Sequence, residues 1–199
     1  MPKYLSLMLV LVLLTSCAQA RISAGRWLTQ QTLDQPEEYF VYATLLKERF
    51  LTPEIKRLVI EAYTSIDDQS FSDLDETIKR AAPLSAETAA NFRSKRARLK
   101  LHDDFGLAVE VDFLSQKERA TIFKRSSKNY DGWRAFYGKY PASPGILKLS
   151  RVGFNADKSQ ALIFVAHSCG WLCGEGNYFV LVKKDGEWKI MKELVTWMS

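Results

Sequence analysis

Four strand-like runs, rich in apolar residues, occupy the C-terminal part of the chain. Short turn signals separate the runs, and Asp185-Gly186 between the last two is a strong signal for a tight hairpin. Consecutive strands with short links predict an antiparallel meander of four strands. The runs cover residues 145–154, 160–167, 178–183 and 187–197.

Helical spacing dominates the chain upstream of these strands. Residues 36–50 carry an apolar face that should pack on a sheet, with Asp34 as the candidate cap and Pro36 in the first turn. Residues 70–98 look helical, with Ser72 and Ser85 as caps and Pro83 as a break. The apolar face consists of Tyr39, Tyr42, Leu45, Leu46 and Phe50.

Two shorter runs ahead of the meander read as single strands. They lie at residues 55–64 and 107–114, and the second leads into a capping box of Ser115 and Glu118. The sequence therefore predicts the α+β class, with N-terminal helices and isolated strands leading into a C-terminal four-stranded antiparallel meander.

A stripe of large aromatic side chains marks one more helix. Trp133, Phe136, Tyr137 and Tyr140 recur at helical spacing. Such a stripe could stack a ligand, but aromatic residues at this spacing more often form core. We therefore expect mainly a packing role, and keep Trp133 and Tyr137 as possible binding residues.

The first residues have the pattern of an export signal. Lys3 precedes an apolar run over residues 4–14, which is too short to span a bilayer as a helix. Leu14-Thr15-Ser16-Cys17 then resembles the bacterial lipobox, which implies lipidation of Cys17 and a membrane anchor. Ordinary secretion, with cleavage after Ala18-Gln19-Ala20, is the alternative.

These features predict three parts and a location. Residues 1–16 are the lipoprotein signal peptide, residues 17–35 the lipidated cysteine and a polar tether, and residues 36–199 a single α+β domain. The domain should lie in the cell envelope, facing the periplasm. Because Ala18 follows the cysteine, the outer membrane is favoured over the inner one if the source is Gram-negative.

Charge and composition narrow the classes of partner. The net charge of +5 is modest, and hydrophobic residues at 47% are too abundant for a disordered chain. The basic cluster Arg93–Lys100 contains no interleaved aromatic residue, so we expect a solvated helix face and no binding to nucleic acid. Arg151 and Lys158 are expected as charges on the sheet surface.

The C-terminal half also resembles a known family. The residues that carry the resemblance are D-G-W-x-x-F-Y-x-K-Y-P-x-S-x-G from Asp131, L-S-R-V-G-F-N from Leu149, the two-cysteine loop and K-K-D-G-x-W-K. They are similar to a family of uncharacterised bacterial secreted proteins and lipoproteins that end in this sheet. The resemblance implies an architecture and supplies no activity.

The loop His167-Ser-Cys169-Gly-Trp171-Leu-Cys173 carries the richest chemistry. Outside the cytoplasm two nearby thiols are expected to form a disulfide, which would fix the loop's shape. Trp171 could then anchor a partner at a rigid tip. Metal binding by His167, Cys169 and Cys173, with Cu(I) as the fitting ion, and thiol exchange are weaker alternatives.

Other catalytic patterns are weak. His102-Asp103-Asp104 has no attached nucleophile, and nothing fixes the geometry of Glu61 with Asp67 and Asp68. The sequence indicates no cofactor. We therefore expect a binding or envelope-maintenance module rather than an enzyme, with an unknown envelope protein or ligand as its partner. A periplasmic thiol- or copper-handling protein is the alternative, and a hydrolase would need a polar cleft with shifted carboxylates.

Overall fold

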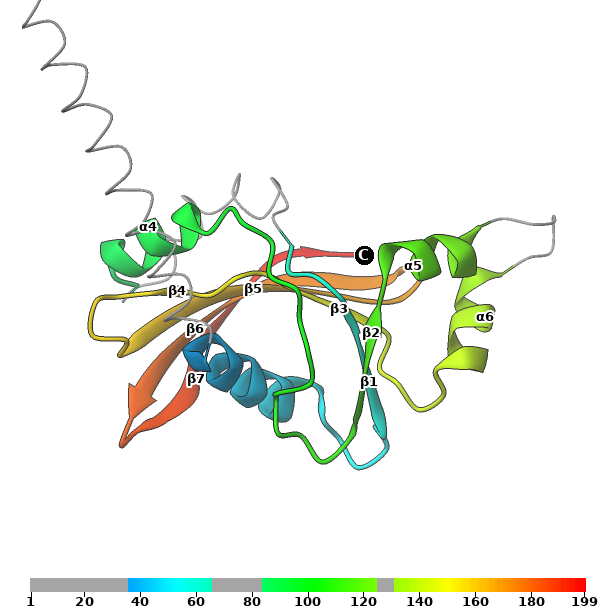
Figure 1. Ribbon diagram of the computed structural model, residues 1–199, viewed down its shortest axis with the longest axis horizontal. Coiled ribbons are helices and arrows are strands. Elements are labelled where there is room, and N and C mark those ends of the chain that lie inside the picture. Colours follow the sequence, from blue (N-terminus) through cyan, green and yellow to red (C-terminus); the bar gives the residue numbers. More distant parts are fainter. Residues whose placement is uncertain (1–35, 66–83, 125–130) are drawn as a thin grey trace, which may run out of the picture. The chain divides into compact units, whose positions relative to one another are not determined.

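A mixed sheet of seven strands forms the framework of the protein in the computed structural model (Figure 1). The structure describes residues 36–65, 84–124 and 131–199. The strand order is β2-β1-β3-β5-β6-β7, and the short strand β4 pairs with β5. The strands are β1 (Arg57–Glu61), β2 (Glu110–Leu114), β3 (Ile146–Leu149), β4 (Gly153–Phe154), β5 (Gln160–Gly170), β6 (Cys173–Lys184) and β7 (Glu187–Met198).

The sheet has a parallel part and an antiparallel part. β1 lies between β2 and β3 and is parallel to both, whereas the pairs β3–β5, β5–β6 and β6–β7 are antiparallel. The prediction of an α+β chain that ends in an antiparallel meander is confirmed. The two upstream strands, expected as isolated, join the same sheet, because pairing satisfies backbone groups that a lone strand would leave without partners.

The run at residues 145–154 forms two strands instead of one. Ser150 lies between them, and its hydroxyl accepts a hydrogen bond from the backbone N–H of Phe164 at 2.9 Å. The same hydroxyl donates to the carbonyl of Arg151 at 2.7 Å. The N–H of Phe164 is thus bound by the serine side chain instead of a backbone carbonyl, and the pairing with β5 is interrupted between β3 and β4.

Helices begin where the sequence offers caps. Residues 36–50 are helical, followed by α4 (Ala86–Ser94), α5 (Gln116–Phe123) and α6 (Gly132–Lys139). Ser85 and Ser115 accept hydrogen bonds from the backbone N–H groups of Thr88 and Glu118, as expected of caps. Asp131 caps α6 in the same way. The predicted cap Asp34 and the expected features at Ser72 and Pro83 lie outside the described residues.

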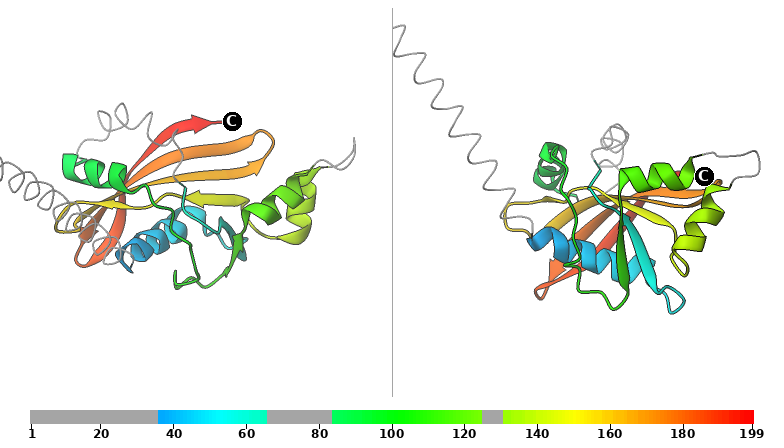
Figure 2. Two further views of the ribbon diagram at one scale, coloured as in Figure 1. Left: turned by 45° about the horizontal axis from the view of Figure 1, so that its top comes forward. Right: turned by 45° about the vertical axis from the view of Figure 1, so that its right-hand side comes forward.

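One face of the sheet is covered by the helix of residues 36–50 (Figure 2). The predicted apolar face of this helix is buried, and the hydroxyl of Tyr42 donates to the carbonyl of Ser150 at 2.9 Å. Alternate residues of four strands complete one continuous cluster, so this face is the main core. These strands contribute Leu58, Ile60, Leu147, Leu149, Ala161, Ile163, Val165, Phe179 and Leu181, and Phe154 of β4 and Trp188 of β7 join the same cluster.

The other face is covered in two separate places. α4 packs over β4, β5 and β6 through Phe92, and it lies so close that a Cβ on Gly153 would stand 2.5 Å from the Phe92 backbone. α5 and α6 form a second cluster with Val59 and Ile146. In Figure 1, α4 and α5 lie apart above the sheet. Strand positions between the two clusters therefore lack a helix directly over them among the described residues.

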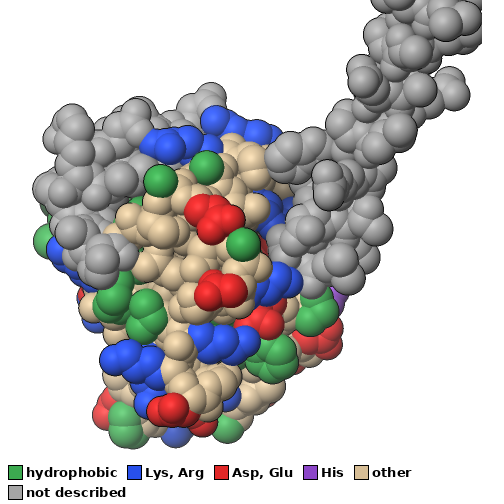
Figure 3. Space-filling view, turned by 90° about the vertical axis from the view of Figure 1, so that its left-hand side faces the viewer, with side chains coloured by type: hydrophobic (Ala, Val, Ile, Leu, Met, Phe, Trp, Pro, Cys, Tyr) green, Lys and Arg blue, Asp and Glu red, His purple; other side chains and the backbone are tan. Residues whose placement is uncertain are grey.

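The basic cluster Arg93–Lys100 is not a helix face. α4 ends at Ser94, Lys95 is buried at its C-terminus, and Arg98 belongs to the irregular segment that follows. Arg151, expected on the surface, is 3% exposed and donates to the carbonyl of Ala97 at 3.4 Å. In the view of Figure 3, charged side chains of both signs are mixed with single apolar ones.

Residues Tyr39–Ser199 form one compact unit. The expected signal peptide, Cys17 and tether lie outside the described residues. Among the residues that the structure describes, no helix has both the length and the apolar character needed to cross a membrane.

Candidate functional sites

A two-residue turn, Trp171-Leu172, joins β5 to β6 and is closed by the two cysteines. Cys169 and Cys173 lie at disulfide distance, with their Cα atoms 5.1 Å apart. The ladder between β5 and β6 shifts register between Ser168 and Gly170, which places Cys169 at a bulge. We call residues 169–173 the cysteine loop.

The tip of the cysteine loop is apolar and exposed. Trp171 is 69% exposed and Leu172 is 88% exposed, although both side chains are large and hydrophobic. The indole N–H of Trp171 donates to a carboxylate oxygen of Asp131 at 3.2 Å. That same oxygen accepts from the backbone N–H of Trp133 at the start of α6. The tip is therefore attached to the beginning of a helix.

The aromatic stripe supports the base of the loop. Phe136 and Tyr140 are buried, whereas Trp133 and Tyr137 are half-buried. The hydroxyl of Tyr137 donates to the carbonyl of Cys169 at 2.9 Å. Burial raises the pKa of Tyr137 above its ordinary value, so this hydroxyl keeps its proton at neutral pH. Trp133 and Tyr137 thus lie beside the cysteine loop.

A hydrogen bond and an ion pair connect α5 to α6 at the Tyr140 end of the aromatic stripe. Glu118 on α5 accepts a hydrogen bond from the Tyr140 hydroxyl at 2.7 Å and pairs with Lys139. The Lys139 ammonium and the Tyr140 hydroxyl hold the pKa of Glu118 below its ordinary value. Glu118 also raises the pKa of Lys139. These contacts join α5 to α6, the helix whose Tyr137 holds the base of the cysteine loop.

The side chain of His167 contacts Pro144, Glu175 and Phe50. Its Nε2 lies 2.8 Å from the carbonyl oxygen of Pro144, its Nδ1 lies 3.8 Å from Glu175, and its ring packs edge-on against Phe50. Across residues 36–65, 84–124 and 131–199, no three His, Cys, Asp or Glu side chains are grouped as a metal site would require.

The second histidine lies elsewhere. The Nδ1 of His102 is 2.8 Å from a carboxylate oxygen of Asp104, and its ring stacks on Tyr39 with centroids 4.9 Å apart. Its side chain is 60% exposed, so the arrangement is that of a surface turn. Asp67 and Asp68, the acids considered with Glu61, lie outside the described residues.

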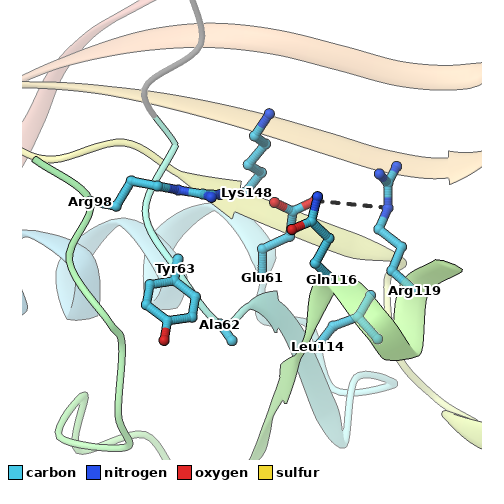
Figure 4. Close-up of a pocket in the computed structure, with 8 residues that line it drawn as sticks. All are labelled: Glu61, Ala62, Tyr63, Arg98, Leu114, Gln116, Arg119 and Lys148. Carbon is cyan, nitrogen blue, oxygen red and sulfur yellow. Dashed lines mark ion pairs between the residues drawn. The ribbon is translucent and has the colours of Figure 1, made fainter. Parts of the chain in front are cut away.

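A pocket of about 390 Å³ opens on the face of the sheet that carries α4 and α5 (Figure 4). It lies where β1 and β2 end, because Glu61 and Leu114 are their last residues, and Lys148 of β3 stands beside them. α5 begins at its edge with Gln116. The lining residues are Glu61, Ala62, Tyr63, Arg98, Leu114, Gln116, Arg119 and Lys148.

Most of the charged side chains in the described lining of this pocket are cationic. Its described lining carries three cationic side chains, Arg98, Arg119 and Lys148, and one carboxylate, Glu61. Arg119 pairs loosely with Glu61, with its Nε 3.8 Å from the carboxylate oxygen. Arg98 donates to the carbonyl of Thr64 at 3.2 Å. We call the site formed by Glu61, Arg98, Gln116, Arg119 and Lys148 the basic pocket.

The sequence offered only weak signals for the basic pocket. Lys148 interrupts an apolar strand at a position that faces the same way as Ile146, and Arg98 is one of many cations in its cluster. Their proximity depends on the parallel pairing of β1 with β2 and β3, which brings together residues far apart in the chain. Of the residues considered from sequence, only Glu61 and the cluster containing Arg98 contribute.

The chain was compared with family models, curated proteins and solved structures. No protein-family model matches the chain, and no curated protein or solved structure shows significant similarity to it.

Proposed function

We propose that this protein is a lipid-anchored binding module of the cell envelope. The N-terminal pattern, with Lys3, an apolar run and Leu14-Thr15-Ser16-Cys17, supports export and lipidation of Cys17. A lipid on one residue holds a folded domain at a membrane without a spanning helix. The described residues then make up the domain that carries out the binding.

The contact surface is the tip of the cysteine loop, and the observation that carries this proposal is its exposure. Trp171 and Leu172 are 69% and 88% exposed, whereas the large apolar side chains of β5 behind them are buried. Burying either side chain against a partner would contribute about 2 kcal/mol. Tryptophan is among the residues most enriched at the energetic centre of interfaces.

The loop is also held in shape before any partner arrives. The paired cysteines close the turn, Asp131 holds the indole of Trp171, and Tyr137 holds the carbonyl of Cys169. A contact residue that is already ordered loses less conformational entropy on binding. This arrangement favours a binding role, in which the disulfide stays permanently oxidised.

The thiol- or copper-handling alternative needs reduced cysteines beside His167. The Nε2 of His167 instead lies 2.8 Å from a backbone carbonyl, and Tyr137 holds the carbonyl of Cys169. These contacts suit a fixed loop better than a pair of thiols that cycle. An alkylation test separates the two, since thiols that react without reductant would support the alternative.

A pair of double variants tests the binding role. Trp171→Ala with Leu172→Ala should abolish crosslinks between the full chain and its partner in intact cells, with unchanged thermal stability. Lys184→Ala with Glu187→Ala, at the opposite end of β6, is the matched control and should leave the crosslinks intact. Crosslinks that persist in the tip variant would remove the tip from the proposal.

The anchor is tested separately. Cys17→Ser should prevent incorporation of labelled palmitate and release the protein from the membrane fraction. Continued membrane association of Cys17→Ser, without label in the wild type, would favour a secreted protein held by other contacts.

A further inference from the structure

The basic pocket gathers its side chains from four separate segments of the chain. Glu61 comes from β1, Arg98 from the segment after α4, Arg119 from α5, and Lys148 from β3. In Figure 4, Glu61 and Gln116 lie between Arg98 on one side and Arg119 on the other, with Lys148 close by. Its volume of about 390 Å³ lies within the range of small-molecule sites.

Three described acidic residues outside the lining, Glu110, Asp112 and Glu118, pair with cations that do not line the pocket. Glu118 binds Lys139 and Tyr140, and Arg57 pairs with Glu110 and with Asp112 on β2. Glu61 is therefore the one carboxylate in the described lining, facing three cations.

The two arginines are positioned to present donors. Arg98 uses its Nε for the carbonyl of Thr64 and lies over the ring of Tyr63, 5.7 Å from the centroid. This contact fixes the guanidinium by one nitrogen. Arg119 faces Glu61 at 3.8 Å, beyond hydrogen-bond distance. Guanidinium groups match carboxylate and phosphate oxygens in pairs, so this geometry suits an oxyanion.

We propose that the basic pocket binds a small organic molecule bearing a carboxylate or phosphate group. Arg98, Arg119 and Lys148 hold the oxyanion. Glu61 and Gln116 lie close enough to the same space to take hydrogen bonds from a hydroxyl or amine next to it. The ligand class is thus a small oxyanion with a neighbouring hydrogen-bond donor. The proposal does not depend on the tip of the cysteine loop.

Calorimetric titration of the full chain at low salt tests the proposal with three probes. Inorganic phosphate and succinate separate the two kinds of oxyanion, and malate adds one hydroxyl to succinate. We expect saturable binding of at least one oxyanion, weakened by added salt, with malate tighter than succinate if carboxylates are preferred. Glycerol, which has hydroxyls and no charge, should not bind.

Substitutions in the lining test whether the oxyanion binds in the basic pocket. Arg119→Gln with Lys148→Gln should lower the affinity by at least about tenfold. Lys117→Gln, an exposed charge on the same helix that does not line the pocket, is the matched control and should leave the affinity unchanged. A second measurement on the wild type covers the case of a misfolded variant, since the side-chain amide signal of Gln116 should shift during the titration.

Two results would overturn the proposal. One is the absence of saturable binding for phosphate, succinate and malate up to about 10 mM. The other is binding that leaves the Gln116 amide signal unmoved and the pocket variant at wild-type affinity. Neither result bears on the tip, whose test uses other residues and another readout.

Discussion

Strand β6 has a tight turn at each end, and the two turns are built in different ways. At one end Asp185-Gly186 links β6 to β7, and both residues have positive φ, 52° and 84°. At the other end Trp171-Leu172 links β5 to β6, and neither residue has a positive φ. The first turn is polar at its tip, and the second exposes two large apolar side chains.

The comparison shows that a tight turn between these strands does not require exposed apolar side chains. Asp-Gly adopts the twisted two-residue turn that matches two antiparallel strands, and needs no further support. The Trp-Leu turn sits next to a bulge, a pair of cysteines and two hydrogen bonds from α6 and its cap. Folding gains nothing from exposing tryptophan and leucine to water. Their exposure is the observation on which the proposed contact with a partner rests.

The largest expected effect on stability comes from removing the disulfide of the cysteine loop. Cys169→Ser with Cys173→Ser should lower the free energy of unfolding by about 2 kcal/mol, because the closed ring is short and restricts the unfolded chain only locally. Chemical denaturation of the oxidised wild type and the variant measures this. A loss near zero would mean that Asp131 and Tyr137 hold the loop without the disulfide.

The stability of the Asp185-Gly186 turn depends on its glycine. Gly186→Ala should lower the free energy of unfolding by about 1 kcal/mol, because a Cβ there meets no neighbouring atom and the cost is purely that of positive φ. Gly138→Ala is the control, since a Cβ there also has open space but the residue is helical. It should be neutral or stabilising. Equal losses for both would contradict the conformational explanation.

The support of the cysteine loop is expected to weaken in acid. Glu118→Gln should lower the free energy of unfolding by about 1 kcal/mol at pH 7, because the carboxylate accepts from the Tyr140 hydroxyl. The pKa of Glu118 is lowered in the folded state, so its contribution is present above the ordinary pKa and lost as the pH falls. Denaturation at pH 7 and about pH 3 should show wild type and variant converging.

The smallest expected effect on stability comes from the tip itself. Trp171→Ala with Leu172→Ala should change the free energy of unfolding by no more than about 0.5 kcal/mol, because both side chains are mostly in water. Thermal unfolding measures this directly. A loss of several kcal/mol would show that the tip has a structural role and would remove the argument from its exposure.

Local patterns predicted the elements that local chemistry determines. The apolar spacing at residues 36–50, the caps Ser85 and Ser115 and the Asp185-Gly186 turn all depend on residues a few positions apart, and each is found where expected. The exposed position of the cysteine loop also follows from its place between two strands.

Features that depend on distant pairing were not predictable in this way. Ser150 interrupts a strand through its bond to Phe164, and the parallel place of β1 beside β3 arises only once the sheet has formed. The basic pocket needs that pairing to bring Glu61 and Lys148 together with Arg98 and Arg119. The spacing of residues along the chain carries no information about contacts between distant segments. In the sequence these four residues are therefore only separate charged positions.

The most direct test of the central claim places a photoreactive residue at either end of β6 in the full chain, in intact cells. At Leu172 we expect an adduct of discrete mass that disappears with Trp171→Ala. At Glu187, exposed beside the polar turn, we expect none. Equal adducts at both positions, or none at Leu172, would contradict a specific contact through the cysteine loop.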